Sequence, residues 1–274
     1  MEQQKQKCVA TSAESRSTGK RKVTIGSVWG SNKCGKFVVE GYKNANSVTV
    51  RFLETGFETI SASGNIRRGE VRDKLSRSVY GVGVIGDGEY AVSKNGKQVR
   101  MYKVWKGMIE RCYENKRQKS SPTYKGCSVF GGWHNYQNFA KWYCDNYPRD
   151  GIGYHLDKDL KVIGNKFYSP ETCMFVTPMV NTFTTSRDAL RGDFLVGVTV
   201  EKKSGRFLAK CNNPFTATNE YIGCFMDEVE AHLAWRKRKS ELAYELATTQ
   251  DRDEVKQALL NWKDALDSNE IHPY

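Results

Sequence analysis

Tyr154-His155-Leu156-Asp157-Lys158-Asp159 is the stretch that decides how this chain is interpreted, together with Gly164-Asn165, the run from Tyr168 to Pro178, and Asn181. Successive side chains of a strand point to opposite faces, so His155, Asp157 and Asp159 would share one face of an extended segment. Proline suits the first position of a helix, so Asn181 would lie in the first turn of a helix that begins at Pro178. The stretch therefore predicts a His-Asp-Asp edge, an arrangement that supports metal binding.

This stretch resembles the ββα-metal nuclease finger of the HNH type. The resemblance implies that His155 is the general base that activates water and that Asn165 is the central asparagine that ties the loop together and orients that base. It also implies that Asn181 is a metal ligand on the last helix. The segment that carries the rest of the resemblance is Tyr168-Ser169-Pro170-Glu171-Thr172-Cys173-Met174-Phe175-Val176-Thr177-Pro178, which is similar to the Y-x-P-E-N-C-x-W/F-x-T run of such fingers.

Two residues depart from the pattern of that family. Tyr154 stands where a ligating Asp or His is expected, and a phenol is a poor Mg²⁺ ligand at neutral pH. Thr172 replaces the asparagine of the E-N-C run. Asp157 and Asp159 are the carboxylates that could supply the missing metal ligand. The resemblance then implies a divalent cation, Mg²⁺ with Mn²⁺ as the alternative, held by Asp157, Asp159 and Asn181.

The charge of the chain indicates a polyanionic partner. In 274 residues, 43 Lys and Arg against 31 Asp and Glu give a net charge of +12 and, with it, a pI near 9.2. A protein this basic is expected to bind nucleic acid, and double-stranded DNA is the partner that we predict.

The cysteines and the N-terminus indicate the compartment. Eight cysteines are scattered without a C-x-x-C pair, which argues against a zinc ribbon and against a disulfide scaffold. Residues 1–22 are polar and charged, so we expect a disordered tail without a signal sequence. No apolar run is long enough for a membrane span. We therefore expect free thiols and a cytoplasmic protein, in the host cytoplasm if a phage encodes it.

We expect an α+β protein built from small modules. Residues 23–95 show short strands, with period-two alternation in Ser47–Phe52, and resemble the small SH3-like barrel found ahead of nuclease fingers in phage proteins. Residues 100–190 form the nuclease region. It opens with two helices whose aromatic stripes, around Trp105 and Phe139, are typical of core. The loop 114–125 between these helices carries Lys116, Arg117 and Lys119, which could contact phosphates.

Residues 191–247 show three strand-like runs and then a helix from Glu228. This order, with G-R-F-x-A-K at 205–210 and Y-I-G-x-F at 221–225, resembles the AP2 DNA-binding domain. The resemblance implies a sheet that reads DNA through Lys202, Lys203, Arg206 and Lys210. Residues 248–274 form a further amphipathic helix.

These observations predict a phage HNH-like DNA endonuclease, homing or free-standing, that hydrolyses phosphodiester bonds with His155 as base. One alternative is an inactive finger kept as a DNA-binding or regulatory protein. The other is a factor that captures a host protein through the first module or the acidic tail. A single finger cuts one strand, so a double-strand break would require a homodimer or two successive cleavage events by one monomer.

Overall fold

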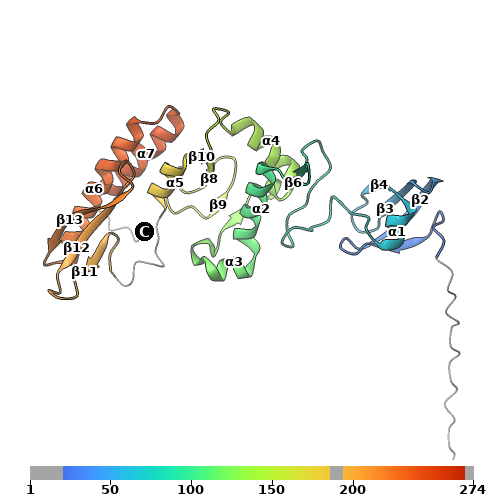
Figure 1. Ribbon diagram of the computed structural model, residues 1–274, viewed down its shortest axis with the longest axis horizontal. Coiled ribbons are helices and arrows are strands. Elements are labelled where there is room, and N and C mark those ends of the chain that lie inside the picture. The colour runs from blue at the N-terminus through green and yellow to red at the C-terminus, as the bar shows by residue number, and fades with distance from the viewer. Residues whose placement is uncertain (1–20, 186–193, 269–274) are drawn as a thin grey trace, which may run out of the picture. The chain divides into compact units, whose positions relative to one another are not determined.

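The structure is a computed structural model that describes residues 21–185 and 194–268. Residues 1–20 of the expected tail lie outside these ranges, as does the expected boundary near residues 190 and 191. The chain divides into two compact units, residues 1–76 and 77–274. Both units mix helices and strands, which confirms the α+β class (Figure 1). Within the described ranges, no helix has the length and apolar content needed to cross a bilayer.

The first unit is built on one antiparallel sheet of four strands in the order β1-β2-β3-β4. In β3 the side chains of Val48, Val50 and Phe52 are fully buried while their neighbours are only partly so, which confirms the period-two prediction. The elements are β1 (Val28–Gly30), β2 (Lys36–Asn44), β3 (Ser47–Phe52), β4 (Glu58–Ser61) and α1 (Ser63–Arg68).

The expected barrel is not closed. Within residues 21–76, β1 pairs only with β2 and β4 only with β3, so the sheet is open at both edges. The unexpected helix α1 follows β4 and buries Ile66 against the sheet, where a closing strand would otherwise be needed. Gly69, with φ of 67°, ends that helix in the left-handed conformation that glycine tolerates best.

Residues 77–99 belong to the second unit, although the sequence placed the first module as far as residue 95. The Tyr136 hydroxyl donates to the Ala91 carbonyl at 3.0 Å, and the Gln137 amide donates to the Tyr90 carbonyl at 3.1 Å. Gly83 lies so close to the Trp105 ring that a Cβ would be 2.9 Å from it. A small hairpin ends the segment, with β5 (Ser93–Lys94) and β6 (Lys97–Gln98).

Two helices then build an aromatic core, as their stripes predicted. Trp105, Tyr136 and Phe139 are completely buried. The 114–125 segment, expected as a loop, instead contains a short exposed helix, because the Glu114 side chain accepts a hydrogen bond from the Lys116 amide and caps it. The elements are α2 (Arg100–Tyr113), α3 (Asn115–Ser120), η1 (Pro122–Tyr124), η2 (Gly131–His134) and α4 (Tyr136–Asn146).

Residues 128–184 contain two short strand pairs and a helix that follows them. The pair β8–β10 is antiparallel, with His155 opposite Val176, and the pair β7–β9 is parallel. Pro178 begins the last helix, as predicted, and the Thr177 side chain caps it. The elements are β7 (Ser128–Val129), β8 (His155–Asp157), β9 (Phe167–Tyr168), β10 (Met174–Val176) and α5 (Pro178–Thr184).

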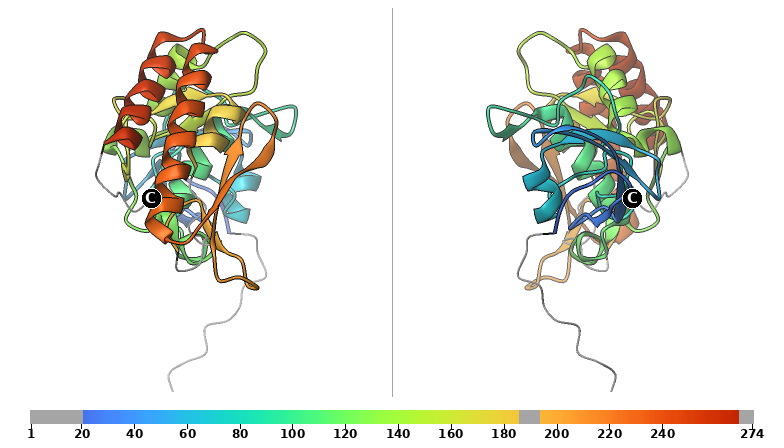
Figure 2. Two further views of the ribbon diagram at one scale, coloured as in Figure 1. Left: turned by 90° about the vertical axis from the view of Figure 1, so that its left-hand side faces the viewer. Right: turned by 90° about the vertical axis from the view of Figure 1, so that its right-hand side faces the viewer.

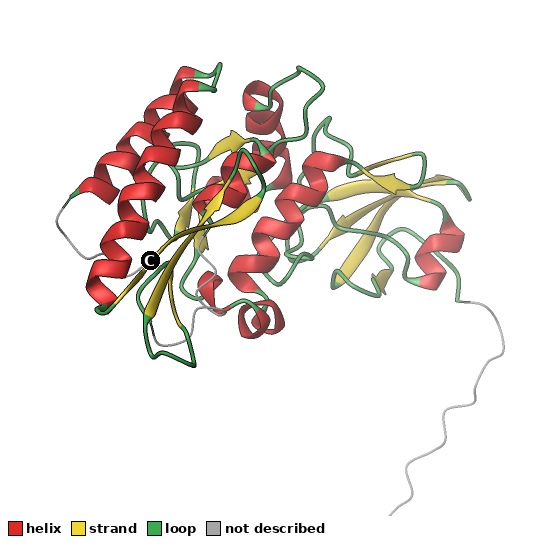
Figure 3. Ribbon diagram, turned by 60° about the vertical axis from the view of Figure 1, so that its left-hand side comes forward, coloured by secondary structure: helices red, strands yellow, loops and turns green. Residues whose placement is uncertain are grey.

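The C-terminal part is a three-stranded antiparallel sheet with two helices that lie side by side (Figures 2 and 3). Ala209 and Cys211 of the central strand are fully buried beneath α6, because the helix covers one face of the sheet. The helix expected from Glu228 and the tail helix are both present. The elements are β11 (Val198–Val200), β12 (Phe207–Asn213), β13 (Thr218–Phe225), α6 (Glu228–Thr248) and α7 (Asp253–Asp267).

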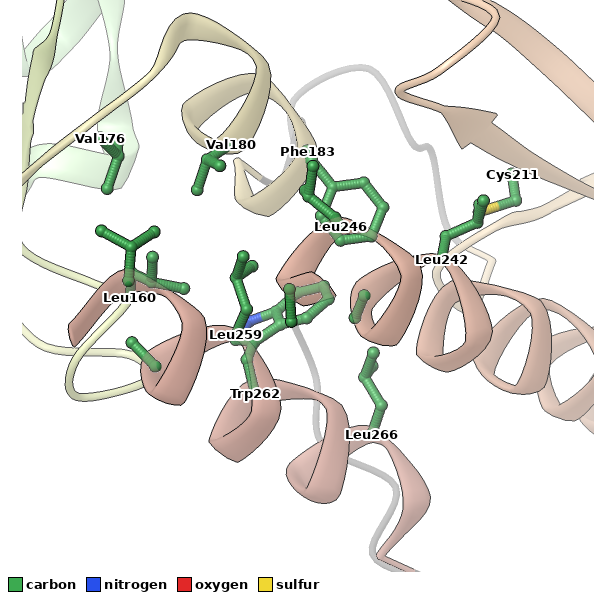
Figure 4. Packing of buried hydrophobic residues seen from close by; sticks show 14 of the residues in the cluster. Leu160, Val176, Val180, Phe183, Cys211, Leu242, Leu246, Leu259, Trp262 and Leu266 are labelled. Carbon is green, nitrogen blue, oxygen red and sulfur yellow. The ribbon is translucent and has the colours of Figure 1, made fainter. Parts of the chain in front are cut away.

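One hydrophobic cluster joins α5 to this C-terminal part. Val180 and Phe183 of α5 contact the same buried cluster as Leu246 of α6 and Leu259 and Trp262 of α7 (Figure 4). Burying apolar surface contributes about 25 cal/mol per Å², so a shared cluster of this kind resists separation of the parts. The helix α5 and the C-terminal sheet with its helices are therefore held together by a shared core and are not separate domains joined by a linker.

Candidate active site

The predicted site residues line one cavity of about 680 Å³ in the second unit. His155, Asp157 and Asp159 come from β8 and the turn after it, Asn165 from the following loop and Asn181 from α5. Residues separated by up to 26 positions thus converge, because β10 pairs with β8 and leads directly into α5.

His155 is the first residue of β8 and its side chain is exposed. The preceding residue is held firmly. The Tyr154 carbonyl accepts from the Arg100 guanidinium at 2.8 Å, and the Tyr154 amide donates to the Tyr147 hydroxyl at 3.1 Å. The backbone that carries the imidazole is therefore fixed, while the ring itself remains open to the cavity.

Asp157 is buried and its carboxylate stabilises the turn after β8. Its Oδ1 accepts from the Asp159 amide at 2.8 Å and from the Leu160 amide at 2.7 Å. Burial raises the pKa of this carboxyl group, although both amide hydrogen bonds act in the opposite direction. The turn ends the strand at Asp157, so the expected shared strand face for His155, Asp157 and Asp159 is wrong at its last member. Asp159 lies in the turn, where the Lys158 ammonium donates to its carboxylate.

Asn165 bridges the two sides of the loop between β8 and β9. Its amide nitrogen donates to the Lys158 carbonyl at 2.8 Å and to the Phe167 carbonyl at 2.6 Å, and its Oδ1 accepts from the Phe167 amide at 3.0 Å. These bonds use both the nitrogen and the oxygen of the side-chain amide, so Asn165 holds the two sides of the loop together beside the cavity.

The two departures from the family pattern have structural roles. The Tyr154 hydroxyl donates to the Asp150 carboxylate, which makes it a poor candidate for a metal ligand. The Thr172 hydroxyl donates to the Phe167 carbonyl at 2.7 Å and accepts from the Ser169 amide at 3.1 Å. Thr172 thus closes the turn that precedes β10 and makes contacts of the kind that an asparagine could also make.

The cavity offers few free donors for a metal ion. Within residues 21–185 and 194–268, no group of three or more His, Cys, Asp or Glu side chains is arranged to hold a metal ion. Asp157 has only one carboxylate oxygen free of the turn, and Asp159 is paired with Lys158. Mg²⁺ is commonly bound by one or two carboxylates, with water and substrate phosphate completing an octahedron, and the residues of the cavity that would supply such donors are Asp157, Asp159 and Asn181.

Cations surround the cavity and were largely missed by the sequence. Arg100, Lys103 and Arg111 all come from α2, at positions that share one face of a helix. That spacing was the available signal, and the aromatic stripe of the same helix obscured it. The full set of cationic residues that line the cavity is Arg100, Lys103, Arg111, Lys158 and Lys166. Asp157 and Asp159 also line the cavity, so its cationic side chains outnumber the acidic ones, and an excess of positive charge in a concave surface attracts anions.

The basic residues predicted to contact DNA lie outside this cavity. Only Lys210 lies on a strand of the C-terminal sheet; Lys202 and Lys203 lie in the turn after β11, and Arg206 directly precedes β12. The sequence placed Arg206 inside a strand-like run over 205–210, whereas β12 begins one residue later, at Phe207. That these four residues contact DNA stays a prediction. Lys116, Arg117 and Lys119 are exposed on α3 rather than on a loop.

No protein-family model matches the chain, and neither does any curated protein or any solved structure.

Proposed function

We propose that this protein is a phage-type, HNH-like DNA endonuclease that hydrolyses phosphodiester bonds with the help of a divalent cation. The observation that carries the proposal is the convergence of His155, Asp157 and Asn181 on one cation-lined cavity. A nucleic-acid strand is the polyanion that best matches a cavity with five cationic side chains and a chain with a net charge of +12.

In this proposal each residue has a defined task. His155 accepts a proton from the attacking water, since its imidazole is exposed and its backbone is fixed. Asn165 keeps the loop closed and so maintains the position of the turn next to the base. Asp157, Asp159 and Asn181 would hold Mg²⁺ or Mn²⁺. The cation, when bound, stabilises the negative charge that develops on the leaving oxygen.

The finer fold assignments belong to the same proposal. We interpret the antiparallel pair β8–β10 and the helix α5 as the ββα finger, and residues 198–248 as an AP2-like unit. We interpret the first unit as a relative of SH3-like modules with an open sheet. Asn212, Asn219 and Tyr221 are exposed on the face of the C-terminal sheet that α6 leaves uncovered, and this face would lie against DNA.

The decisive experiment is a plasmid nicking assay. Supercoiled DNA is incubated with the full-length protein in Mg²⁺, in Mn²⁺ and in EDTA, beside His155→Ala and the control Glu171→Ala. Glu171 is an exposed residue of the same finger that does not line the cavity. We expect nicking that requires metal, that is lost in His155→Ala and that persists in Glu171→Ala.

A second candidate function is a DNA-binding protein whose finger does not cut. The commitment of Asp157 to its turn, and the lack of a three-residue metal cluster in the described ranges, favour it. This candidate predicts no cleavage under any condition, together with retained duplex binding that weakens when Arg206 and Lys210 are neutralised.

A further inference from the structure

Arg111 is a cation of the cavity that has no acidic partner among the described residues. The guanidinium lies between two aromatic rings, with Cζ 5.5 Å from the centroid of Tyr124 and 5.7 Å from that of Tyr168. Its Nε donates to the Tyr168 hydroxyl at 3.2 Å. Among the residues that the structure describes, no carboxylate lies within ion-pair distance of Arg111.

The hydroxyl partner does not neutralise this cation. Burial raises the pKa of Tyr168, so the phenol stays protonated at neutral pH and serves as an acceptor without a charge. A cation that is partly removed from water and left unpaired costs folding free energy. Such a cost is expected where an anionic ligand completes the arrangement on binding.

Arg111 lines the same cavity as His155. Its Nε is bonded to the Tyr168 hydroxyl, and in the described ranges neither terminal nitrogen is both buried and without a hydrogen-bond partner. The guanidinium lies over the rings of Tyr124 and Tyr168, which restrict its position, and its planar set of N–H groups matches the oxygens of an anion.

We propose that Arg111 is a phosphate-binding residue that donates hydrogen bonds to the non-bridging oxygens of one phosphodiester group inside the cavity. The planar fork matches two oxygens of a phosphate, and bidentate pairing of this kind gives both strength and orientation. The ligand class is the phosphodiester of a nucleic-acid strand; a free phosphate monoanion or dianion shares the same chemistry. The inference rests on the proposed function for its choice of ligand, although the binding itself requires no cleavage.

Side-chain NMR of the full-length protein tests this binding directly. The Arg111 Nε–H signal is assigned by its loss in Arg111→Lys. The protein is then titrated, in EDTA, with the dinucleotide thymidylyl-(3′→5′)-thymidine, with its neutral methylphosphonate analogue and with inorganic phosphate. The signal of Arg149, which is exposed and does not line the cavity, is the internal control.

We expect a saturable shift of the Arg111 signal with the dinucleotide, none with the methylphosphonate and none at Arg149. A shift with inorganic phosphate but not with the dinucleotide would overturn the assignment to a nucleic-acid strand. No shift with any of the three ligands would overturn the site itself.

Duplex binding gives an independent measurement. In EDTA, the slope of log affinity against log salt concentration should fall by about one unit in Arg111→Met, since one phosphate contact is lost, and affinity should fall about tenfold. Arg149→Met should change neither. An unchanged slope in a folded Arg111→Met protein would contradict the proposal. Both tests are done without metal, so they do not depend on cleavage. A protein that binds phosphate through Arg111 but never nicks DNA would refute the proposed nuclease activity and would support the phosphate site.

Discussion

Lys239 is a buried cation whose replacement by methionine should stabilise the protein at neutral pH and lose that advantage at high pH. Its ammonium donates to the Phe183 carbonyl at 2.7 Å and lies 3.6 Å from the centroid of the Phe183 ring. Only 7% of the residue is exposed, and desolvation by burial lowers its pKa from 10.5 to about 8. In Lys239→Met the unbranched stem is kept while the charge is removed.

The magnitude follows from proton linkage. A shift of 2.5 units, from 10.5 to about 8, corresponds to about 3 kcal/mol by which burial disfavours the charged amine. The unfolded chain binds more protons between these two values, so this penalty is full below pH 8 and is relieved as pH rises toward 10.5. By the same relation about 1.4 kcal/mol of it remains at pH 9.5. Losing the bond to the Phe183 carbonyl costs about 1 to 2 kcal/mol at either pH.

We therefore expect Lys239→Met to be more stable than the wild type by about 1 to 2 kcal/mol at pH 7 and to have little or no advantage at pH 9.5. Urea unfolding with reductant, followed by far-UV circular dichroism, measures the difference. The control is Lys237→Met, an exposed lysine of the same helix, which should show no such pH dependence. A difference between variant and wild type that is the same at both pH values would refute a depressed lysine pKa.

Three further changes test the fold and the site. Gly197→Ala should destabilise the protein by more than about 3 kcal/mol in urea, because φ is +80° and a Cβ would be 2.0 Å from Trp235; Gly205→Ala, with φ of +70° and open space, should cost about 1 kcal/mol, and equal costs would contradict the clash. Asn165→Ala should lose about 1 to 3 kcal/mol and raise amide exchange across 158–167, whereas unchanged exchange would exclude its bridging role. Arg252→Met removes a donor to the Phe175 carbonyl of β10, the strand that pairs with β8 and so positions His155; nicking should therefore slow about tenfold with unchanged duplex affinity, and a loss confined to affinity would argue against positioning.

Local features of the site followed from the sequence. The strand at Ser47–Phe52, the helix from Glu228 and the helix start at Pro178 were all predicted. These elements depend on near-neighbour spacing and on capping residues, which a linear sequence displays. The short helix α3 was missed because its cap, Glu114, is not among the residues that usually cap helices.

What the sequence determined by itself is the basic charge, the alternation within strands and the aromatic helical stripes. The tertiary structure decided which side chains meet. It committed one oxygen of Asp157 to a turn, placed the Arg111 guanidinium beside Tyr124 and Tyr168, and joined α5 to α6 and α7 in one core. These outcomes depend on contacts between residues far apart in the chain, whose free energies are set by packing and desolvation rather than by local backbone preference.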